Sequence, residues 1–344
     1  MSNPVKIAVV GGGYGAKIPL PAYAELDEFE PVAAWSRRPK RAAELAASFG
    51  LQLGTADLDE LLAHPGLEAV HVAGPVATHA EVAIAAARCG LHVLCEKPLA
   101  ANLDDALEVV AAIEQAGVVG VVNYGRRMQA TRERLLERVA QVAGAPRMVS
   151  ISLVHADHAE ADSRPFTWVQ DRALGGGRLQ AYGVHDLDLL LQAFGEVAEV
   201  AAATAVGIGE RRSADGTPHA VTAEDAYAIL VRFRGGGLAQ VSLTATARHA
   251  RGDVVEIHGA QGTVRLGEDR VLWSGRAGEE LSPEGPLKAD SKAAFRRIAR
   301  NFHAAIRDGG APDPSLQEAL RVQALLDAIH LADAERRWVT PRWT

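Results

Sequence analysis

Cysteine, long apolar stretches and an excess of basic charge are missing or scarce in this sequence of 344 residues. Its two cysteines, Cys89 and Cys95, cannot build a disulfide framework, so nothing indicates an oxidising compartment. Charged residues interrupt each apolar stretch before it is long enough to span a bilayer. The 36 basic and 43 acidic side chains give a formal charge of -7, which supplies no overall attraction for nucleic acid or an anionic membrane.

Targeting signals are also lacking near the N-terminus. Met1 leads directly into the short apolar segment 6–10, with no signal core and no cleavage site. We therefore expect a cytoplasmic protein without nucleic-acid or membrane partners. A chain of this length predicts two domains, at roughly 150 residues per domain.

Short, continuously apolar segments alternate with helical patterns in the first third of the chain. The predicted strands are residues 6–10, 31–35, 69–73, 92–95 and 118–122, and the predicted helices are 19–26, 38–49, 58–62, 79–88 and 103–115. Apolar strands separated by helices are typical of a parallel sheet that is covered on both faces. We predict a doubly wound α/β domain over residues 1–123.

The pattern changes after about residue 123. The predicted helices are residues 130–142, 184–194, 292–307 and 315–335, the predicted strands include 148–154, 226–233, 238–245, 254–258 and 263–266, and 209–218 and 275–286 are predicted loops. Consecutive strands with short glycine-rich connections indicate an antiparallel sheet. We predict a second α/β domain over residues 124–344 with an open, mainly antiparallel sheet. Because an open sheet face needs covering, we expect a homodimer or homotetramer formed through it.

A glycine-rich turn follows the first predicted strand. The pattern Gly11-x-Gly13-x-x-Ala16 stands between strand and helix and encloses Tyr14 and Gly15. Gly11 permits a tight turn, Gly13 lets the backbone approach a pyrophosphate, and Ala16 lets helix and strand pack closely. The alternative is a packing turn in another α/β fold. The strand–turn–helix context favours the dinucleotide site of a Rossmann domain.

The end of the second predicted strand bears on the choice of cofactor. An NAD site usually has an acidic residue there, which accepts hydrogen bonds from the ribose 2′-hydroxyl. Here the strand ends with Ser36, Arg37 and Arg38, without an acid. Arginines could simply be solvated at the helix start, but the helix dipole makes that position unfavourable for them. An arginine fork matches a 2′-phosphate, so the sequence favours NADP over NAD.

A lysine stands at the end of another buried strand, in Glu96-Lys97-Pro98. In open parallel sheets, ligands bind at the carboxyl ends of the strands. Lys97 is therefore either a surface lysine or a group directed into a ligand cleft. The residues alone leave both interpretations open.

Several motifs resemble the glucose–fructose oxidoreductase/inositol dehydrogenase family over nearly the whole chain. They are residues 73–79, Glu96-Lys97-Pro98, residues 123–127, Trp168, the glycine run 175–177 and the segment Gly-Val-His-Asp-Leu-Asp at 183–188. The resemblance implies an NAD(P)-dependent oxidoreductase that transfers a hydride between the nicotinamide and a sugar, a polyol or a related alcohol or carbonyl. It also implies a Rossmann domain followed by an α/β domain with an open antiparallel sheet.

The resemblance further implies the roles of individual residues. Lys97 hydrogen-bonds the substrate hydroxyl, His185 exchanges its proton, and Pro98 follows a cis peptide bond. The implied cofactor contacts are Gly11, Gly13, Tyr14, Gly15, Ala16, Ser36, Arg37, Arg38, Pro75, His79, Glu96 and Lys97. The implied substrate contacts are Lys97, Arg127, Trp168, Tyr182 and His185. An imidazole titrates near neutrality, which suits proton transfer in either direction.

Three positions depart from the family pattern. Gly74 and Val76 replace its Thr and Asn beside the nicotinamide, and Ala181 replaces its Asp four residues before the histidine. Asp186 or Asp188 could partly replace the lost carboxylate. Two alternative functions stay open, of which the first is motivated by Ala181 and Val76 and the second by its occurrence within similar folds. One is a nucleotide-binding sensor that has lost catalysis, and the other is a non-redox lyase or glycosidase that retains its dinucleotide.

A histidine-rich segment has the residue types of a metal site. His155, Asp157 and His158 stand close together, with Asp162 following. Their spacing fixes no coordination geometry and fits a solvated or substrate-contacting loop better. We therefore predict no metal.

Overall fold

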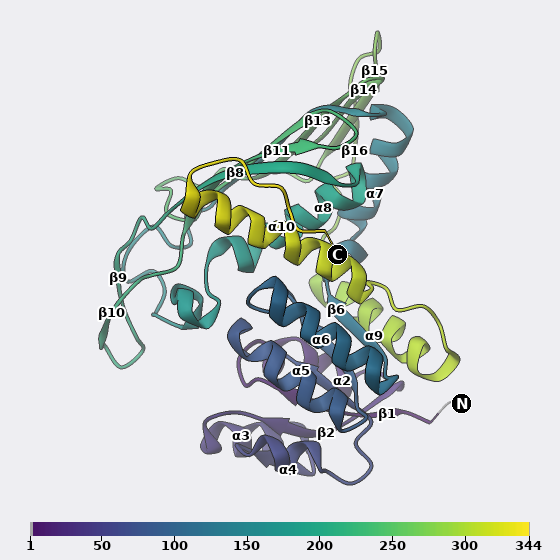
Figure 1. Cartoon of the computed structure of the whole chain (residues 1–344), viewed down its shortest axis with the longest axis vertical. Helices are drawn as coiled ribbons and strands as arrows, with labels where there is room; N and C mark the ends of the chain where they lie inside the picture. Colours follow the sequence, from purple (N-terminus) through teal and green to yellow (C-terminus); the bar gives the residue numbers. More distant parts are fainter. Residues whose placement is uncertain (1–2, 344) are drawn as a thin grey trace. The chain divides into compact units, whose positions relative to one another are not determined.

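The computed structural model describes residues 3–343, which form two compact units (Figure 1). The first unit comprises residues 1–128 and 290–323, and the second comprises 129–289 and 324–344. Helix α10 (Leu316–Glu335) passes from one unit into the other. The sequence-based division at residue 123 differs from this result, because it assigned 290–323 to the second domain.

The first unit contains a parallel sheet of six strands in the order β3-β2-β1-β4-β5-β6. The strands are β1 (Val5–Val10), β2 (Phe29–Trp35), β3 (Leu53–Thr55), β4 (Ala69–Val72), β5 (His92–Glu96) and β6 (Gly120–Asn123). This order is that of a Rossmann fold, as predicted, and it reverses between β1 and β4. The short edge strand β3 falls in a segment for which the sequence predicted no element.

Seven helices of the first unit are α1 (Tyr14–Lys17), α2 (Pro19–Ala24), α3 (Pro39–Phe49), α4 (Leu58–Leu62), α5 (His79–Arg88), α6 (Leu103–Ala116) and α9 (Ser291–Asp308). α9 explains why its segment belongs here. Phe295, Ile298 and Phe302 of this helix are fully buried in the same core as Tyr23 and Phe29. No local pattern marks which of two cores an amphipathic helix will cover, so the sequence left this assignment open to error.

The second unit contains a sheet of eight strands in the order β16-β15-β14-β13-β7-β12-β11-β8. The strands are β7 (Pro146–Val154), β8 (Val197–Ala205), β11 (Ala226–Phe233), β12 (Leu238–Thr244), β13 (Gly252–Gly259), β14 (Gly262–Leu266), β15 (Leu272–Arg276) and β16 (Ser282–Glu284). Only β7 and β12 pair in parallel, so the sheet is mainly antiparallel, as predicted.

One face of this sheet is covered by helices α7 (Ala130–Arg138) and α8 (Val184–Phe194) and by the end of α10 (Figure 1). Burial alternates along the strands, with Tyr227, Ile229 and Val231 of β11 directed into the core. Two predicted loops contain strands instead. Residues 209–218 include β9 (Glu210–Arg212) and the start of β10 (Pro218–Ala220), and residues 275–286 include β16. Within residues 3–343, no helix is long and apolar enough to cross a membrane.

Candidate active site

Three of the four glycines within residues 11–15, which join β1 to α1 and begin that helix, differ in their surroundings. Gly11 has a φ of 135°, and a Cβ there would lie 2.3 Å from the carbonyl oxygen of Ala73. A Cβ on Gly13 would meet no atom within 4 Å, so the space beside it is open. A Cβ on Gly15 would lie 2.7 Å from Cγ1 of Val9 on β1. The close helix–strand packing therefore depends on Gly15, and Ala16, to which the sequence attributed it, packs against the same core.

Basic side chains gather where β2 ends and α3 begins. Arg37 and Arg38 are exposed, and neither guanidinium has a partner within the part of the chain that the structure describes. Arg38 is the N-cap of α3, whose first turn contains no acid. The Ser36 side chain is buried and accepts a hydrogen bond from the Arg38 amide at 3.3 Å. The helix dipole and these cations together form a site that suits an anion.

Arg41 of α3 is a further basic residue at this site that was not predicted from the sequence. Its Nε donates to the carbonyl oxygen of Gly12 at 3.2 Å, which places a third arginine against the glycine turn. Its guanidinium also pairs with Glu44 at 3.3 Å. The available signal was its position, because residue 41 lies three residues after Arg38 and therefore on the same side of a helix.

The loop after β4 is tied to the Lys97-Pro98 segment by a buried histidine. The ring nitrogens of His79 lie 2.9 Å from the carbonyl oxygen of Pro98 and 3.1 Å from that of Gly74. Burial lowers the pKa of His79, so the neutral ring donates to one of these carbonyls. The Thr78 hydroxyl closes the loop by donating to the Pro75 carbonyl at 2.7 Å. Pro75 and His79 thus belong to the same edge of the sheet as the lysine.

Glu96 and Lys97 stand at the carboxyl end of β5, followed by a cis peptide bond before Pro98. Glu96 is buried, and its Oε1 accepts a hydrogen bond from Nδ2 of Asn123 at 2.6 Å. Burial lowers the pKa of Lys97 to about 8, and the Glu96 charge opposes this shift. A lysine that titrates near neutral pH at a ligand edge is typical of a functional group. This finding favours the cleft interpretation over that of a surface lysine.

Arg127 follows β6 and is buried in the first unit. Its guanidinium forms an ion pair with Glu318 of α10, and Asp313 lies 4.0 Å away. It also lies over the Tyr124 ring at 5.7 Å. These contacts give Arg127 a structural function in addition to its predicted contact with substrate.

In the second unit, His185 lies in the first turn of α8, after a π-helical turn over Leu179–Gly183. Its carbonyl oxygen accepts a hydrogen bond from Nη2 of Arg132 on α7 at 2.8 Å. Nη1 of the same arginine lies 3.5 Å from the carboxylate of Asp188, which is 1% exposed. Asp188 is therefore engaged in a buried ion pair beneath the helix. That engagement disfavours it as a replacement for the carboxylate missing at Ala181.

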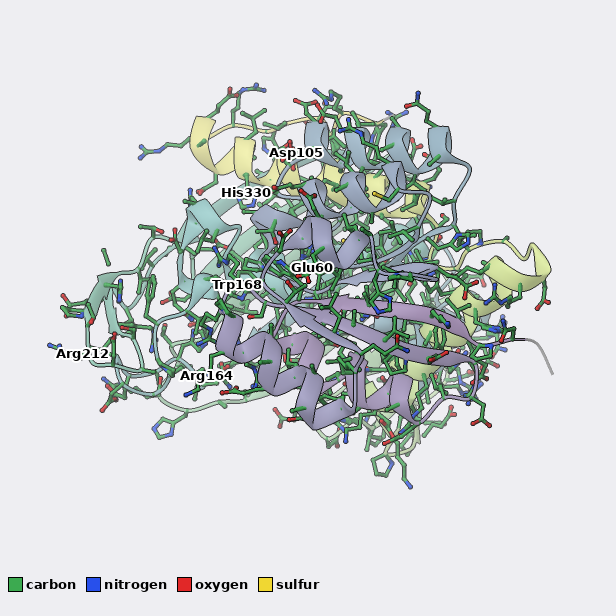
Figure 2. The ribbon with its side chains drawn as sticks, turned by 90° about the horizontal axis from the view of Figure 1, so that it is seen from below. Glu60, Asp105, Arg164, Trp168, Arg212 and His330 are labelled. Atoms are coloured by element: carbon green, nitrogen blue, oxygen red, sulfur yellow. The ribbon has the colours of Figure 1, made fainter. Side chains whose placement is uncertain are left out.

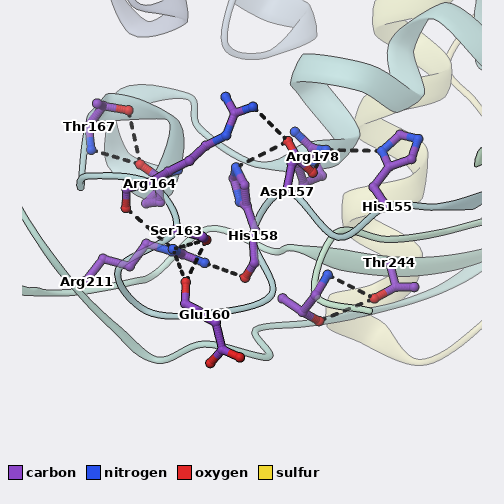
Figure 3. Close-up of polar contacts among 12 residues, drawn as sticks. His155, Asp157, His158, Glu160, Ser163, Arg164, Thr167, Arg178, Arg211 and Thr244 are labelled. Atoms are coloured by element: carbon purple, nitrogen blue, oxygen red, sulfur yellow. Dashed lines mark hydrogen bonds and ion pairs between the residues drawn. The ribbon is translucent and has the colours of Figure 1, made fainter. Parts of the chain in front are cut away.

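Tyr182 lies against Arg178, which also contacts Asp157 and His155 (Figure 3). The Arg178 guanidinium lies 4.9 Å from the centre of the Tyr182 ring and donates to Asp157 at 2.9 Å. His155 lies against the same ring at 5.1 Å, and its Nε2 pairs with Asp253 of β13 at 2.5 Å. The histidine-rich segment, which has the residue types of a metal site, thus contacts an arginine and a tyrosine. No metal-binding group of three or more His, Cys, Asp or Glu occurs among residues 3–343.

Trp168 is half-buried and begins a short 3₁₀ turn, and it is labelled with Arg164 and Arg212 in Figure 2. The loop that leads to it is held by a buried arginine on β9. Arg211 donates to the carbonyl oxygens of His158 at 2.7 Å and of Glu160 at 2.8 Å (Figure 3). The loop is therefore ordered by its own chain rather than left to solvent. Neither this arginine nor Arg178 was singled out from the sequence, because their partners are distant along the chain.

The predicted residues thus form two groups. The first unit brings together the glycine turn, Ser36 to Arg38, Pro75, His79, Glu96 and Lys97 along one sheet edge. The second unit contains Trp168, Tyr182 and His185. The pairing of Lys97 with His185 stays a prediction.

Two family models match the chain. Residues 5–124 match a model described as an oxidoreductase family with an NAD-binding Rossmann fold. Residues 134–265 match one described as the GFO/IDH/MocA C-terminal domain. The first match covers all six strands of the parallel sheet, and the second covers β7, β8, β11, β12, β13 and most of β14.

Relatives with assigned activities also match over much of their length. Levoglucosan dehydrogenase of Pseudarthrobacter phenanthrenivorans is 27% identical over 382 residues, spanning 97% of this chain and 97% of that protein. D-apiose dehydrogenase of Paraburkholderia graminis is 28% identical, spanning 97% of this chain and 89% of that protein. The solved structure of levoglucosan dehydrogenase with NADH has a TM-score of 0.87 and 25% identity, and it covers 99% of this chain and 100% of that chain.

Proposed function

We propose, from the premise that this chain belongs to the GFO/IDH/MocA oxidoreductase family, that it transfers a hydride between NADP and a sugar- or polyol-like substrate. NAD is the alternative cofactor. The observation that carries the proposal is the lysine at the carboxyl end of β5, whose pKa burial lowers to about 8. It lies on the same sheet edge as the open glycine turn and the Pro75 loop.

The residues of the first unit fit a dinucleotide. The open space beside Gly13 leaves room for a pyrophosphate against the backbone. Arg37 and Arg38, with Ser36, would hold a 2′-phosphate, and Arg41 supports the turn beside them. No carboxylate follows β2 to accept the hydrogen bonds of a free ribose hydroxyl. When bound, the nicotinamide supplies the hydride acceptor or donor.

The protein's own groups would manage the proton and the charge on the substrate oxygen. In the direction of oxidation, a ring nitrogen of His185 takes the hydroxyl proton as the carbon loses its hydride. The Lys97 ammonium stabilises the negative charge that develops on the oxygen. Trp168, Tyr182 and Arg127 are the proposed further contacts for substrate hydroxyls, and Arg178 holds the Tyr182 ring.

The names of the relatives support a sugar-like substrate. Levoglucosan, D-apiose and myo-inositol are each rich in hydroxyl groups, and each gives its name to a dehydrogenase similar to this chain. The polar cluster around Tyr182 offers charged and aromatic groups of the kind that recognise such molecules. The substrate is therefore proposed as a class rather than as one compound.

A specific observation favours one second candidate, a nucleotide-binding sensor. Ala181 has no carboxylate, and the nearby Asp188 is already paired with Arg132. A site without its acidic neighbour could bind dinucleotide and sugar without turnover. This candidate shares the Rossmann site of the first one and differs from it only in catalysis.

One experiment separates the two functions. Purified protein is mixed with NADP or NAD and a panel of sugars and polyols that includes levoglucosan, D-apiose and myo-inositol, and formation of reduced nicotinamide is followed by absorbance. If the protein is a dehydrogenase, we expect turnover with at least one compound and faster turnover with NADP than with NAD. Saturable binding of both ligands by calorimetry, without turnover in either direction, would instead establish the sensor.

The uncovered sheet face supports an assembly through the second unit. Exposed apolar side chains on it include Met148, Leu230 and Leu238. A hollow of about 560 Å³ opens on the same sheet and is lined by Ser150, Ser152, Gln240, Ser242, Arg251, Val254, Glu256, Arg265, Gly267, Glu268, Asp269 and Trp273. We keep the homodimer or homotetramer through this face as a proposal. Light scattering tests it, and a monomer at micromolar concentration would contradict it.

A further inference from the structure

A chain of buried polar side chains runs through the first unit to the carboxylate beside Lys97. The Tyr23 hydroxyl on α2 lies 3.0 Å from Nδ1 of His71 on β4. Nε2 of that histidine lies 3.5 Å from Oε1 of Glu96 on β5. Tyr23 and His71 are both 0% exposed, and Glu96 is 8% exposed. These buried side chains thus connect α2, β4 and β5 without exposure to solvent.

The hydrogen-bonding capacity of these side chains determines which of them donates and which accepts. A tyrosine hydroxyl donates readily to an imidazole nitrogen, and Nδ1 is the only ring atom within its reach. With Nδ1 as the acceptor, the proton of the neutral ring resides on Nε2, which then faces the Glu96 carboxylate. Nε2 of His71 has no other partner among residues 3–343. A buried N–H is costly unless it is satisfied, so the carboxylate is its natural acceptor.

Aromatic packing holds the histidine ring in this orientation. The ring stacks on Phe295 of α9, with 5.5 Å between the ring centroids and 16° between the ring planes. It makes an edge-to-face contact with Tyr23, with 5.8 Å between the centroids and 80° between the planes. Tyr23 in turn packs against Phe29 at 4.8 Å. A ring confined on both sides cannot turn away from Glu96 without opening the core. The contact with the carboxylate is therefore a fixed feature of the fold.

The carboxylate at the end of the chain stays charged despite its burial. Burial acts to raise the pKa of Glu96, but His71, Lys97 and the Asn123 amide together hold it below its usual value. The Glu96 charge raises the pKa of Lys97, whereas burial and the Arg126 charge lower it. The other titratable groups that face this pair are Tyr14 of α1, His79 of α5 and Cys95 of β5.

We propose that Tyr23 and His71 form a buried relay that holds Glu96 in its ionised form beside Lys97. The inference rests on the proposed function, because it assigns a use to the charge of Lys97. His71 touches neither reacting group in this account and acts through Glu96, so it is a positioning residue. Without the relay, a larger fraction of Glu96 would be protonated at the pH where Lys97 titrates, and Lys97 would lose its ammonium charge at a lower pH.

The test measures the protonation of Lys97 without any substrate. Competitive acetylation by acetic anhydride over a pH series, read by mass spectrometry on the peptide that contains Lys97, gives the midpoint of its titration. In His71→Leu the midpoint should fall by about one pH unit, a tenfold change in the protonation equilibrium. The alkaline limit of kcat/KM should fall by the same amount, and the Kd for NADP should stay within about twofold.

Three further variants separate the relay from packing. Tyr23→Phe keeps the aromatic core and should lower the midpoint by a smaller amount, because it removes only the donor that fixes the tautomer. His71→Gln keeps a side-chain N–H that can donate to Glu96, so the Lys97 midpoint should lie close to that of the wild-type protein. His303→Leu removes another buried histidine, which packs on Phe29 at 5.8 Å in the same core, and should leave the midpoint unchanged.

A folded His71→Leu variant with an unchanged Lys97 midpoint would overturn the relay, whatever its turnover. If that variant does not fold, an unchanged midpoint in Tyr23→Phe overturns it equally. The proposed function fails separately, when the wild-type protein turns over no substrate. In that case the shifted midpoint would still establish the relay.

Discussion

The first unit positions its candidate residues at the ends of neighbouring strands in one parallel sheet, whereas the second gathers them from segments far apart in the chain. Gly11, Ser36, Pro75 and Lys97 each follow a strand of the Rossmann sheet within a few residues. In the second unit, Tyr182 is held by residues 155 and 178, while His185 is held by a helix about fifty residues earlier.

The difference lies in which interactions determine a side chain's position. In the first unit, strand order alone brings the carboxyl ends together, so short motifs carry most of the information. In the second unit, arginines at positions 132, 178 and 211 bind carbonyls and carboxylates of other segments. Buried charged groups of that kind are costly to disrupt, because removing one partner leaves the other unpaired. Substitutions should therefore act differently in the two units.

The largest expected effect separates catalysis in the second unit from cofactor binding in the first. His185→Asn removes the proposed acid–base group and should lower turnover by about 10²–10⁴-fold. The Kd for NADP, measured by fluorescence titration, should stay nearly unchanged. His249→Asn replaces an exposed histidine of the same unit and should keep full turnover. Full activity of His185→Asn on the natural substrate would show that the assignment is wrong.

A large effect on stability is expected from Arg132→Met. This change removes the cation that lies 3.5 Å from the buried carboxylate of Asp188, which should cost about 3–5 kcal/mol of the free energy of unfolding. Urea unfolding followed by circular dichroism measures it. The double variant Arg132→Met, Asp188→Leu should recover part of the loss, because both charges are removed.

The matched control lies on the same helix. Arg134 forms surface ion pairs with Glu137 and Glu284, and Arg134→Met should lower the free energy of unfolding far less than Arg132→Met does. Equal losses for the two arginines would contradict the view that the second unit depends on buried charge.

The sequence predicted much of the first unit because its signals are local. Glycines 11, 13 and 15, the bare arginines after β2 and the Glu96-Lys97-Pro98 motif each stand beside the strand that positions them. The exceptions involve contacts between distant segments. Arg41 reaches back to the glycine turn, and His71 meets Tyr23 and Glu96 across neighbouring elements. A histidine within an apolar strand gives no sign of its partners.

In the second unit the sequence predicted the sheet and the helix that carries His185, but not the network around them. The hairpin of β9 and β10 was missed, because its strands are three residues long and lie among loop-forming residues. Arg178 and Arg211 have partners that lie 21 and 53 positions away in the sequence, separations that no periodic pattern indicates. The family resemblance identified His185, whereas its contact with Arg132 is seen only in the structure.

Cofactor choice sharpens the comparison in the first unit. Arg37→Ala removes a charge-assisted contact with the proposed 2′-phosphate and should weaken NADP binding about tenfold or more. NAD binding should stay nearly unchanged, because NAD has no phosphate there. Arg88→Ala replaces an exposed arginine on α5 and should change neither affinity. If titrations show that Arg37→Ala weakens both cofactors equally, the side chain is structural and the NADP preference fails.

The smallest expected effect concerns the departure at residue 181. Ala181→Asp places a carboxylate in the π-helical turn that leads into α8, four residues before His185. A nearby negative charge favours the protonated imidazole, so the pH below which oxidation is lost should move upward by up to about one unit. Polyol oxidation at alkaline pH should rise by a few-fold, because the imidazolium that forms in the reaction is better stabilised.

The pH–rate profile of Ala181→Asp decides between two origins of the alanine. A higher rate with a shifted acid limb means that the wild-type site is a dehydrogenase with one supporting charge removed. A lower rate with the same shifted limb means that the added carboxylate reaches His185 but excludes the natural substrate, so that the alanine belongs to the substrate's shape. An unshifted limb would mean that residue 181 does not face the histidine, and the second unit would then orient His185 through the Arg132 contact alone.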